Sequence, residues 1–123
     1  MRLTDILLLV AYAVFMSIGQ VIFKYSSQSL VGAESGAFGI LHRLAMSPTF
    51  WLAIVLYGAL TVLWVWILSR VSLVAAYPFV ALCFVLVPIM SRYAFGERVG
   101  ANYLIGSALV LAGLGFIFGE IGK

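Results

Sequence analysis

Charged residues are scarce in this sequence, and acidic residues are absent from its long apolar stretches. Asp, Glu, Lys and Arg make up 9% of the 123 residues. The four acidic residues lie at or beyond the ends of the apolar stretches, where we expect them to be solvated: Asp5, Glu34, Glu97 and Glu120. A chain that crosses a membrane without a carboxylate at mid-depth lacks the usual group for proton exchange.

Cysteine and histidine each occur once, which limits the possible metal and redox chemistry. Cys83 cannot form a disulfide within the chain, and we expect it to be a small apolar helix residue. His42 has no second ligand at a useful spacing, so we expect it beside lipid headgroups. We predict no metal, no cofactor and no catalytic residue.

The long apolar stretches predict an all-α membrane protein. There are four of them, each about 18 to 20 residues long, enough for a helix to cross the hydrocarbon core. They run from Ile6 to Phe23, Phe50 to Ser69, Ser72 to Ser91 and Asn102 to Gly119. We predict one domain over residues 1–123 and a first helix that is retained rather than cleaved as a signal peptide.

The loop charges bear on the orientation of the chain. Four crossings place both termini on one side of the membrane. The terminal side carries Arg2, Arg70 and Lys123, and the other side carries Lys24, Arg43, Arg92 and Arg98. This near balance predicts that the chain inserts both ways, as in an antiparallel dimer of dual topology. Because the basic residues are spread singly over the loops, they favour lipid headgroups over nucleic acid as neighbours.

Polar residues follow helical spacing on the first two stretches. Ala13, Ser17, Gln20 and Lys24 form one face of the first, and Tyr57, Thr61 and Trp64 do the same on the second. An unpaired amide in hydrocarbon is costly, so Gln20 must face protein or a water-filled cavity. Two alternatives stay open: a bond to a neighbouring helix, or a polar lining shared with Ser17 and Lys24.

The third and fourth stretches carry residues that shape helices. Pro78 and Pro88 leave the carbonyls of Val74 and Phe84 without their usual partners. A helix broken next to Tyr77 would be a candidate hinge and binding wall, and the alternative is that the prolines are purely structural. The fourth stretch has small side chains that allow two helices to approach closely, and we predict a dimer interface there. These residues are Gly106, Ala108, Ala112 and Gly113.

The connection between the first two stretches predicts a short helix at the membrane surface. Phe38, Leu41 and Leu44 recur at helical spacing, with Arg43 on another face. Pro48 then marks the start of the second membrane helix.

Several short motifs together resemble the drug/metabolite transporter superfamily over nearly the whole chain. They are Ser17-Ile-Gly19-Gln20 followed by Lys24, then Ala76-Tyr77-Pro78, Gly96-Glu97-Arg98 and the glycines of the last stretch. The single four-helix unit is similar to the small multidrug resistance branch, whose members form dimers, often antiparallel. The Gly-Gln-x-x-x-Lys and Ala-Tyr-Pro motifs are more similar to the aminoarabinose-phosphoundecaprenol flippase subunits and related EamA-type proteins, which move lipid-linked sugars.

One position separates these branches. The drug exporters carry a glutamate in the first helix that binds proton and cation in turn, and the matching residue is Met16. Methionine can bind neither. The resemblance therefore implies a carrier, not an enzyme, that moves a polyprenyl-phosphate-linked aminosugar across the bacterial inner membrane while the prenyl tail stays in lipid.

The resemblance also implies a substrate route and a partner. The phosphate would pair with Lys24 or Arg92. The polar headgroup would contact side chains along the path: Ser17, Gln20, Tyr57, Trp64 and Tyr77. The chain would form a homodimer, or a heterodimer with a homologous small membrane protein. Two alternatives remain, a proton-coupled exporter of small cations that uses Glu97 and an accessory subunit of a membrane glycosyltransferase.

Overall fold

The computed structural model describes residues 2–32 and 36–121, and all regular secondary structure within these ranges is helical. The elements are α1 (Leu3–Ser27), the 3₁₀ turn η1 (Gln28–Leu30), α2 (Ala37–Ala45), α3 (Pro48–Leu68), α4 (Leu73–Val80), α5 (Cys83–Phe95) and α6 (Ala101–Ile121). Glu34, which we expected to be solvated, and Lys123, which we counted on the terminal side, lie outside the described residues.

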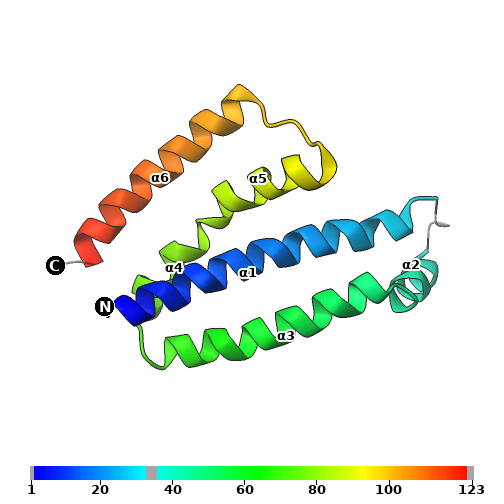
Figure 1. Cartoon of the computed structure of the whole chain (residues 1–123), viewed down its shortest axis with the longest axis horizontal. Helices are drawn as coiled ribbons and strands as arrows, with labels where there is room; N and C mark the ends of the chain where they lie inside the picture. The colour runs from blue at the N-terminus through cyan, green and yellow to red at the C-terminus, as the bar shows by residue number, and fades with distance from the viewer. Residues whose placement is uncertain (1, 33–35, 122–123) are drawn as a thin grey trace.

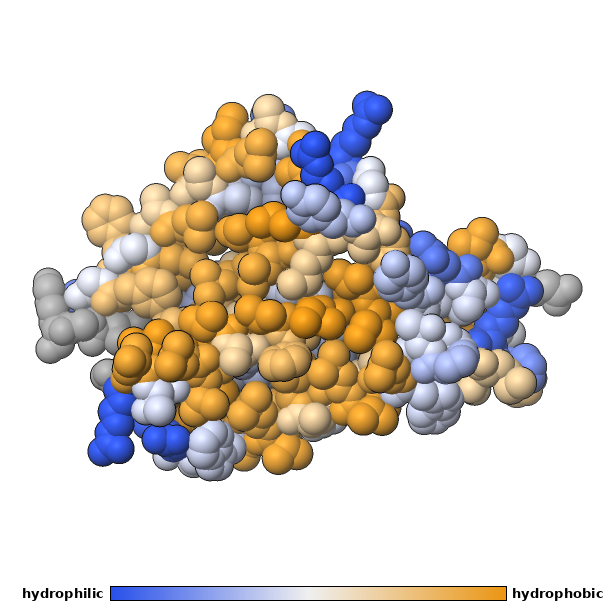
Figure 2. Space-filling model, viewed as in Figure 1, coloured by the Kyte–Doolittle hydropathy of each residue, from blue (hydrophilic) through white to orange (hydrophobic). Residues whose placement is uncertain are grey.

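Four segments of this structure are long and apolar enough to cross a membrane, which confirms the predicted fold class. They are Leu3–Leu30, Pro48–Leu68, Leu73–Phe95 and Ala101–Glu120. Helices α4 and α5 together make the third of these segments. Apolar side chains cover the middle of the molecule, and hydrophilic residues gather toward its ends (Figure 2). The chain is therefore a multi-pass membrane protein.

The helices are arranged around α1, which lies between α3 and α5 (Figure 1). Helix α6 diverges from α5 and returns toward α4, so the start of α1 and the end of α6 lie at the same end of the molecule. We call this the terminal end. The opposite end, where α1 meets α2 and α5 meets the loop to α6, is the distal end.

Serine and proline define where α3 and α4 begin. The Ser47 hydroxyl accepts a hydrogen bond from the Phe50 amide at 3.4 Å, and Pro48 occupies the first turn of α3 as predicted. The Ser72 hydroxyl accepts in the same way from the Ala75 amide at 3.3 Å. These caps satisfy amides at helix starts that have no partner within the helix.

The hydrophobic core lies near the terminal end. It joins α1, α3 and α4 through buried side chains of Leu9, Ile67, Val71, Ala75, Ala76 and Phe79. Helix α6 is attached to this region by the Phe118 ring, whose centroid is 4.9 Å from that of Phe79. Helix α5 has no buried residue, and Leu114 is the one buried residue among those described in α6. The packing is thus tight where α1, α3 and α4 meet, whereas α5 and α6 contribute few buried side chains.

An ion pair at the terminal end corrects one expectation. The Asp5 carboxylate, predicted to be solvated, is only 7% exposed. Its Oδ1 lies 3.5 Å from Nη2 of Arg70, and the Arg70 guanidinium also lies 5.0 Å from the Trp66 ring centroid. The expectation was wrong for Asp5 because the short turn between α3 and α4 brings Arg70 back over the start of α1.

The third membrane segment is broken between α4 and α5, three residues after Pro78. There the amides of Ala81 and Leu82 bond to carbonyls three residues back, at 3.1 Å each, instead of four back. These tighter turns change the direction of the segment (Figure 1).

The second proline lies inside α5 without ending the helix. Pro88 cannot donate to the Phe84 carbonyl, and the hydroxyl of Tyr103 on α6 donates to that carbonyl instead, at 3.1 Å. The predicted need of this carbonyl for a partner is therefore met by another helix.

Candidate functional site

The polar face of α1 meets α3 through one glutamine and one tyrosine. Gln20 Nε2 donates to Tyr57 Oη at 2.9 Å, and Tyr57 Oη donates to the Met16 carbonyl at 3.2 Å. Stacking on the Phe23 ring, with centroids 4.7 Å apart, fixes the tyrosine in place. The Tyr57 hydroxyl thus accepts one hydrogen bond and donates one.

The Gln20 side-chain amide can form a further hydrogen bond. Its side chain is exposed, and its carbonyl oxygen forms no hydrogen bond with the residues that the structure describes. The Gln20 amide therefore has a partner on a neighbouring helix, which both alternatives for Gln20 allow. The free carbonyl oxygen keeps the second alternative open, because it can accept a hydrogen bond from a polar ligand beside α1.

A carboxylate at the distal end holds the lysine that ends this polar face. Lys24 Nζ lies 3.9 Å from Glu97 Oε1, and the Ser91 hydroxyl donates to Glu97 Oε2. The side chains of Lys24 and Glu97 are 53% and 49% exposed. An ion pair this open to solvent contributes little, on the order of 0 to 1 kcal/mol, so a stronger anion can displace the carboxylate.

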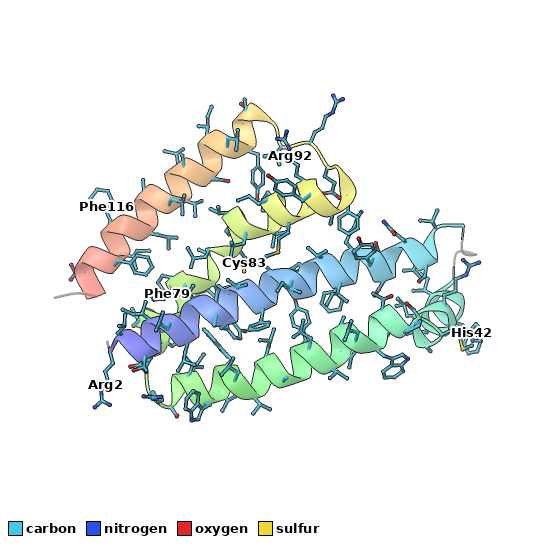
Figure 3. All side chains as sticks on the ribbon, in the orientation of Figure 1. Arg2, His42, Phe79, Cys83, Arg92 and Phe116 are labelled. Atoms are coloured by element: carbon cyan, nitrogen blue, oxygen red, sulfur yellow. The ribbon has the colours of Figure 1, made fainter. Side chains whose placement is uncertain are left out.

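Arg92 lies in the last turn of α5 at the same end (Figure 3). Its guanidinium forms no ion pair or hydrogen bond with any residue in the described ranges. Together with Glu97 and Arg98 it lines a hollow of about 440 Å³. The distal end therefore gathers three cations, Lys24, Arg92 and Arg98, around one carboxylate, and this arrangement favours an anionic ligand.

Ser17, another predicted site residue, is fully buried between α1 and α5. Its hydroxyl donates to the Ala13 carbonyl at 2.8 Å, and its oxygen lies within hydrogen-bonding distance of Cys83 Sγ, at 3.3 Å. Cys83 lies where α4 gives way to α5, facing α1 (Figure 3). In this conformation Ser17 joins the broken segment to α1, and its part in binding stays a prediction.

The remaining predicted aromatic residues do not join Gln20 and Tyr57. Trp64 stacks on Tyr12 with centroids 4.8 Å apart and packs against the core at the terminal end. Tyr77 on α4 is 64% exposed and bonds to none of the described residues. The structure thus joins Gln20 and Tyr57, with Lys24 one turn farther along α1, whereas Arg92 lies between α5 and α6 and Trp64 and Tyr77 lie elsewhere.

Comparison with known proteins identifies the family. A probable 4-amino-4-deoxy-L-arabinose-phosphoundecaprenol flippase subunit ArnE of Pseudomonas syringae pv. syringae is 35% identical over 97 residues, which cover 79% of this chain and 84% of that protein. The probable ArnE of Pseudomonas aeruginosa strain UCBPP-PA14 is 38% identical, covering 87% and 90%. That of Sodalis glossinidius is 37% identical, covering 78% and 80%. The chain belongs to the ArnE family. The resemblance inferred from the short motifs is therefore confirmed.

No protein-family model matches the sequence, and no solved structure matches it. Among residues 2–32 and 36–121 of this ArnE family member, no group of His, Cys, Asp and Glu side chains could hold a metal ion.

The small residues of α6 in this ArnE family member fall on two faces. A Cβ added at Gly106 or Gly113 would meet nothing within 4 Å, so these glycines leave one face open. Ala108 instead faces α5, and Ala112 lines a shallow hollow beside Phe116. Their role in a dimer stays a prediction.

Proposed function

We propose that this chain is one subunit of a flippase that moves an undecaprenyl-phosphate-linked aminosugar across the bacterial inner membrane. It acts as a carrier and not as an enzyme. The observation that carries the proposal is the gathering of Lys24, Arg92 and Arg98 near Glu97, with Lys24 one helical turn beyond Gln20, in a member of a family whose proteins are named as flippase subunits for such a lipid.

Binding begins with the phosphate at the distal end. Lys24 exchanges its weak contact with Glu97 for the phosphate, and Arg92 offers a second cation. Charge-assisted hydrogen bonds to phosphate oxygens are stronger than the exposed ion pair that is lost.

The sugar then lies one helical turn deeper. Gln20 precedes Lys24 by four residues, which is about 6 Å along the helix axis. Its free carbonyl oxygen accepts from a sugar hydroxyl or ammonium group, and Tyr57 keeps the amide directed into the path. Ser17, Trp64 and Tyr77 come into contact later along the route, after the third membrane segment bends at the hinges Pro78 and Pro88.

Proton exchange within the membrane has no part in this mechanism. The position of the exporter glutamate holds Met16, whose carbonyl accepts from Tyr57. Glu97 lies at the distal end, beyond the helix, where Lys24 and Ser91 hold it. We therefore favour the flippase over the proton-coupled exporter of small cations.

The active assembly contains two chains of opposite orientation. The relatives are named as subunits, and α6 of this chain leaves most of its surface exposed. The partner is a second copy or a homologous small membrane protein, packed against α6.

A vesicle assay tests the proposed function. The full chain, alone and with its candidate partner, is reconstituted with an undecaprenyl-phosphate-linked aminosugar, and an amine reagent that cannot cross the membrane reports the sugar in the outer leaflet. We expect the inner-leaflet sugar to become reactive only in vesicles with active protein. Failure of both preparations to move the lipid, in folded protein, would leave the glycosyltransferase accessory subunit as the better interpretation.

A further inference from the structure

A groove between α5 and α6 meets the proposed route only at Arg92. We call it the α5–α6 groove; its volume is about 320 Å³. Its walls are mostly apolar and include Val85, Pro88, Ile89, Leu104, Ala108 and Leu111. Its residues extend from 84 to 92 on α5 and from 103 to 111 on α6.

Specific contacts of α5 and of α6 set the spacing between the two helices that form the groove. Helix α6 packs on the bundle near the terminal end, through Phe118 against Phe79, while α5 leans toward α1. The Tyr103 hydroxyl bridges them by donating to the Phe84 carbonyl, which Pro88 leaves free. The groove is therefore a consequence of specific contacts on both sides.

One end of the groove is charged. Arg92 lines it at the distal end, and its guanidinium has no partner among the described residues. Eight residues separate Phe84 from Arg92, which corresponds to about 12 Å of helix. The hydrocarbon core is roughly 30 Å thick, so the groove extends from the membrane surface to nearly half its depth.

The groove is apolar and large enough to hold part of one hydrocarbon chain, since its volume is about 320 Å³. The Arg92 guanidinium at the membrane surface adds a site for a phosphate at the head of that chain.

We infer that the α5–α6 groove binds the first isoprene units of a polyprenyl phosphate, with the phosphate on Arg92. This inference rests on the proposed function and adds a binding place for the lipid part of the substrate, next to the Arg92 cation that the proposed route already uses. A polyprenyl phosphate brings one chain to one groove, whereas a membrane phospholipid brings two chains and a glycerol unit. The remaining isoprene units leave the groove for the surrounding lipid.

Photolabelling of the full chain tests this site. The protein is placed in phosphatidylethanolamine nanodiscs with polyprenyl phosphate that carries a diazirine on the isoprene unit next to the phosphate. After irradiation, mass spectrometry locates the label. We expect it on residues 84–92 and 103–111, and we expect unlabelled polyprenyl phosphate to compete far better than phosphatidylglycerol.

Two tryptophan variants provide matched controls on α6. Leu104→Trp fills the groove and should reduce labelling several-fold, whereas Leu109→Trp, at a position 69% exposed and outside the groove, should not. Arg92→Gln should weaken binding of the probe by about tenfold, as expected for loss of a charged hydrogen bond.

The outcomes of the labelling experiment distinguish a failure of the groove site from a failure of the proposed function. Label on α3 or at Gln20, equal competition by phosphatidylglycerol, or unchanged labelling of a folded Leu104→Trp variant would overturn the groove site even if lipid-linked sugar is still moved. Labelling of the groove in a protein that moves no sugar would support the site and contradict the flippase.

Discussion

The Tyr57 ring lies directly on Gly19, so closely that a Cβ at position 19 would be 2.6 Å from Tyr57 Cε2. No real Cβ tolerates that distance, so the glycine is what allows the ring to cross α1. From this position the Tyr57 hydroxyl reaches both the Gln20 amide and the Met16 carbonyl. By leaving room for the Tyr57 ring, Gly19 thereby determines the direction in which the Gln20 amide points.

Replacing Gly19 with leucine should displace Tyr57 and release Gln20. We expect a loss of stability of about 1 to 3 kcal/mol, as for other overpacked sites, and reduced transport. Gly58→Leu is the matched control, because Gly58 is an exposed helix glycine and a Cβ added there would meet nothing within 4 Å. Thermal unfolding in detergent and the vesicle assay measure both effects. Equal losses in the two variants would contradict a special role for Gly19.

Substitutions of Lys24 and of Gln20 should affect different steps of transport. Lys24→Ala removes a cation at the mouth and should weaken substrate binding, whereas Gln20→Leu should slow translocation more than binding, since the headgroup meets the amide deeper in the membrane. Binding of the lipid-linked sugar and its rate of exposure in vesicles distinguish the steps. If neither variant changes flipping in folded protein, the route lies elsewhere.

Neutralising the charge of Glu97 should strengthen substrate binding. Glu97→Gln frees Lys24 from its ion pair, so we expect binding of polyprenyl phosphate to tighten by up to about fivefold, the equivalent of 1 kcal/mol. Transport should persist and should not follow an imposed pH gradient. Loss of transport in the variant, together with gradient-driven activity of the original protein, would support the proton-coupled exporter instead.

Tyr103→Phe should weaken the connection between α5 and α6. The Phe84 carbonyl would lose its hydrogen bond in a membrane that offers no water in its place, and we expect a cost of about 1 kcal/mol or more. Tyr93→Phe is the control, because Tyr93 is 87% exposed and bonds to none of the described residues. Thermal unfolding compares the two. A cost that is the same for both would show that the Tyr103 bond is unimportant.

Gly113→Leu should weaken association of the subunits, since the larger side chain holds helix backbones apart. Cross-linking in membranes measures the effect, with Gly58→Leu as the control on another helix. Reporters fused to the C-terminus should signal on both sides of the membrane if a homodimer is antiparallel. A single orientation in a functional homodimer would exclude that arrangement.

The sequence predicted those features that depend on local chemistry. Apolar length predicted the four membrane segments, Pro48 predicted the start of α3, and the prolines predicted an irregular third segment. The cost of an unpaired amide predicted that Gln20 would find a partner, as it does in Tyr57.

The sequence could not predict contacts between segments that are distant along the chain. Asp5 is buried because Arg70 returns to it from the far end of α3. Glu97 pairs with Lys24, and Tyr103 serves the Phe84 carbonyl, only because of how the helices are placed. None of these pairs has a characteristic spacing, so no pattern in one sequence reveals them.

Because the third membrane segment is broken at Ala81 and Leu82, α5 can pivot about the break. The first part of the segment, α4, is fixed in the core, whereas α5 has no buried side chain that would resist a rotation. Helix α5 is about 20 Å long, so a turn of about 10° at the break moves its far end by about 3 Å. That displacement equals the length of a hydrogen bond. A slight bend beside Cys83 is therefore enough to make or break the contact between Glu97, which follows α5, and Lys24 on α1 at the membrane surface.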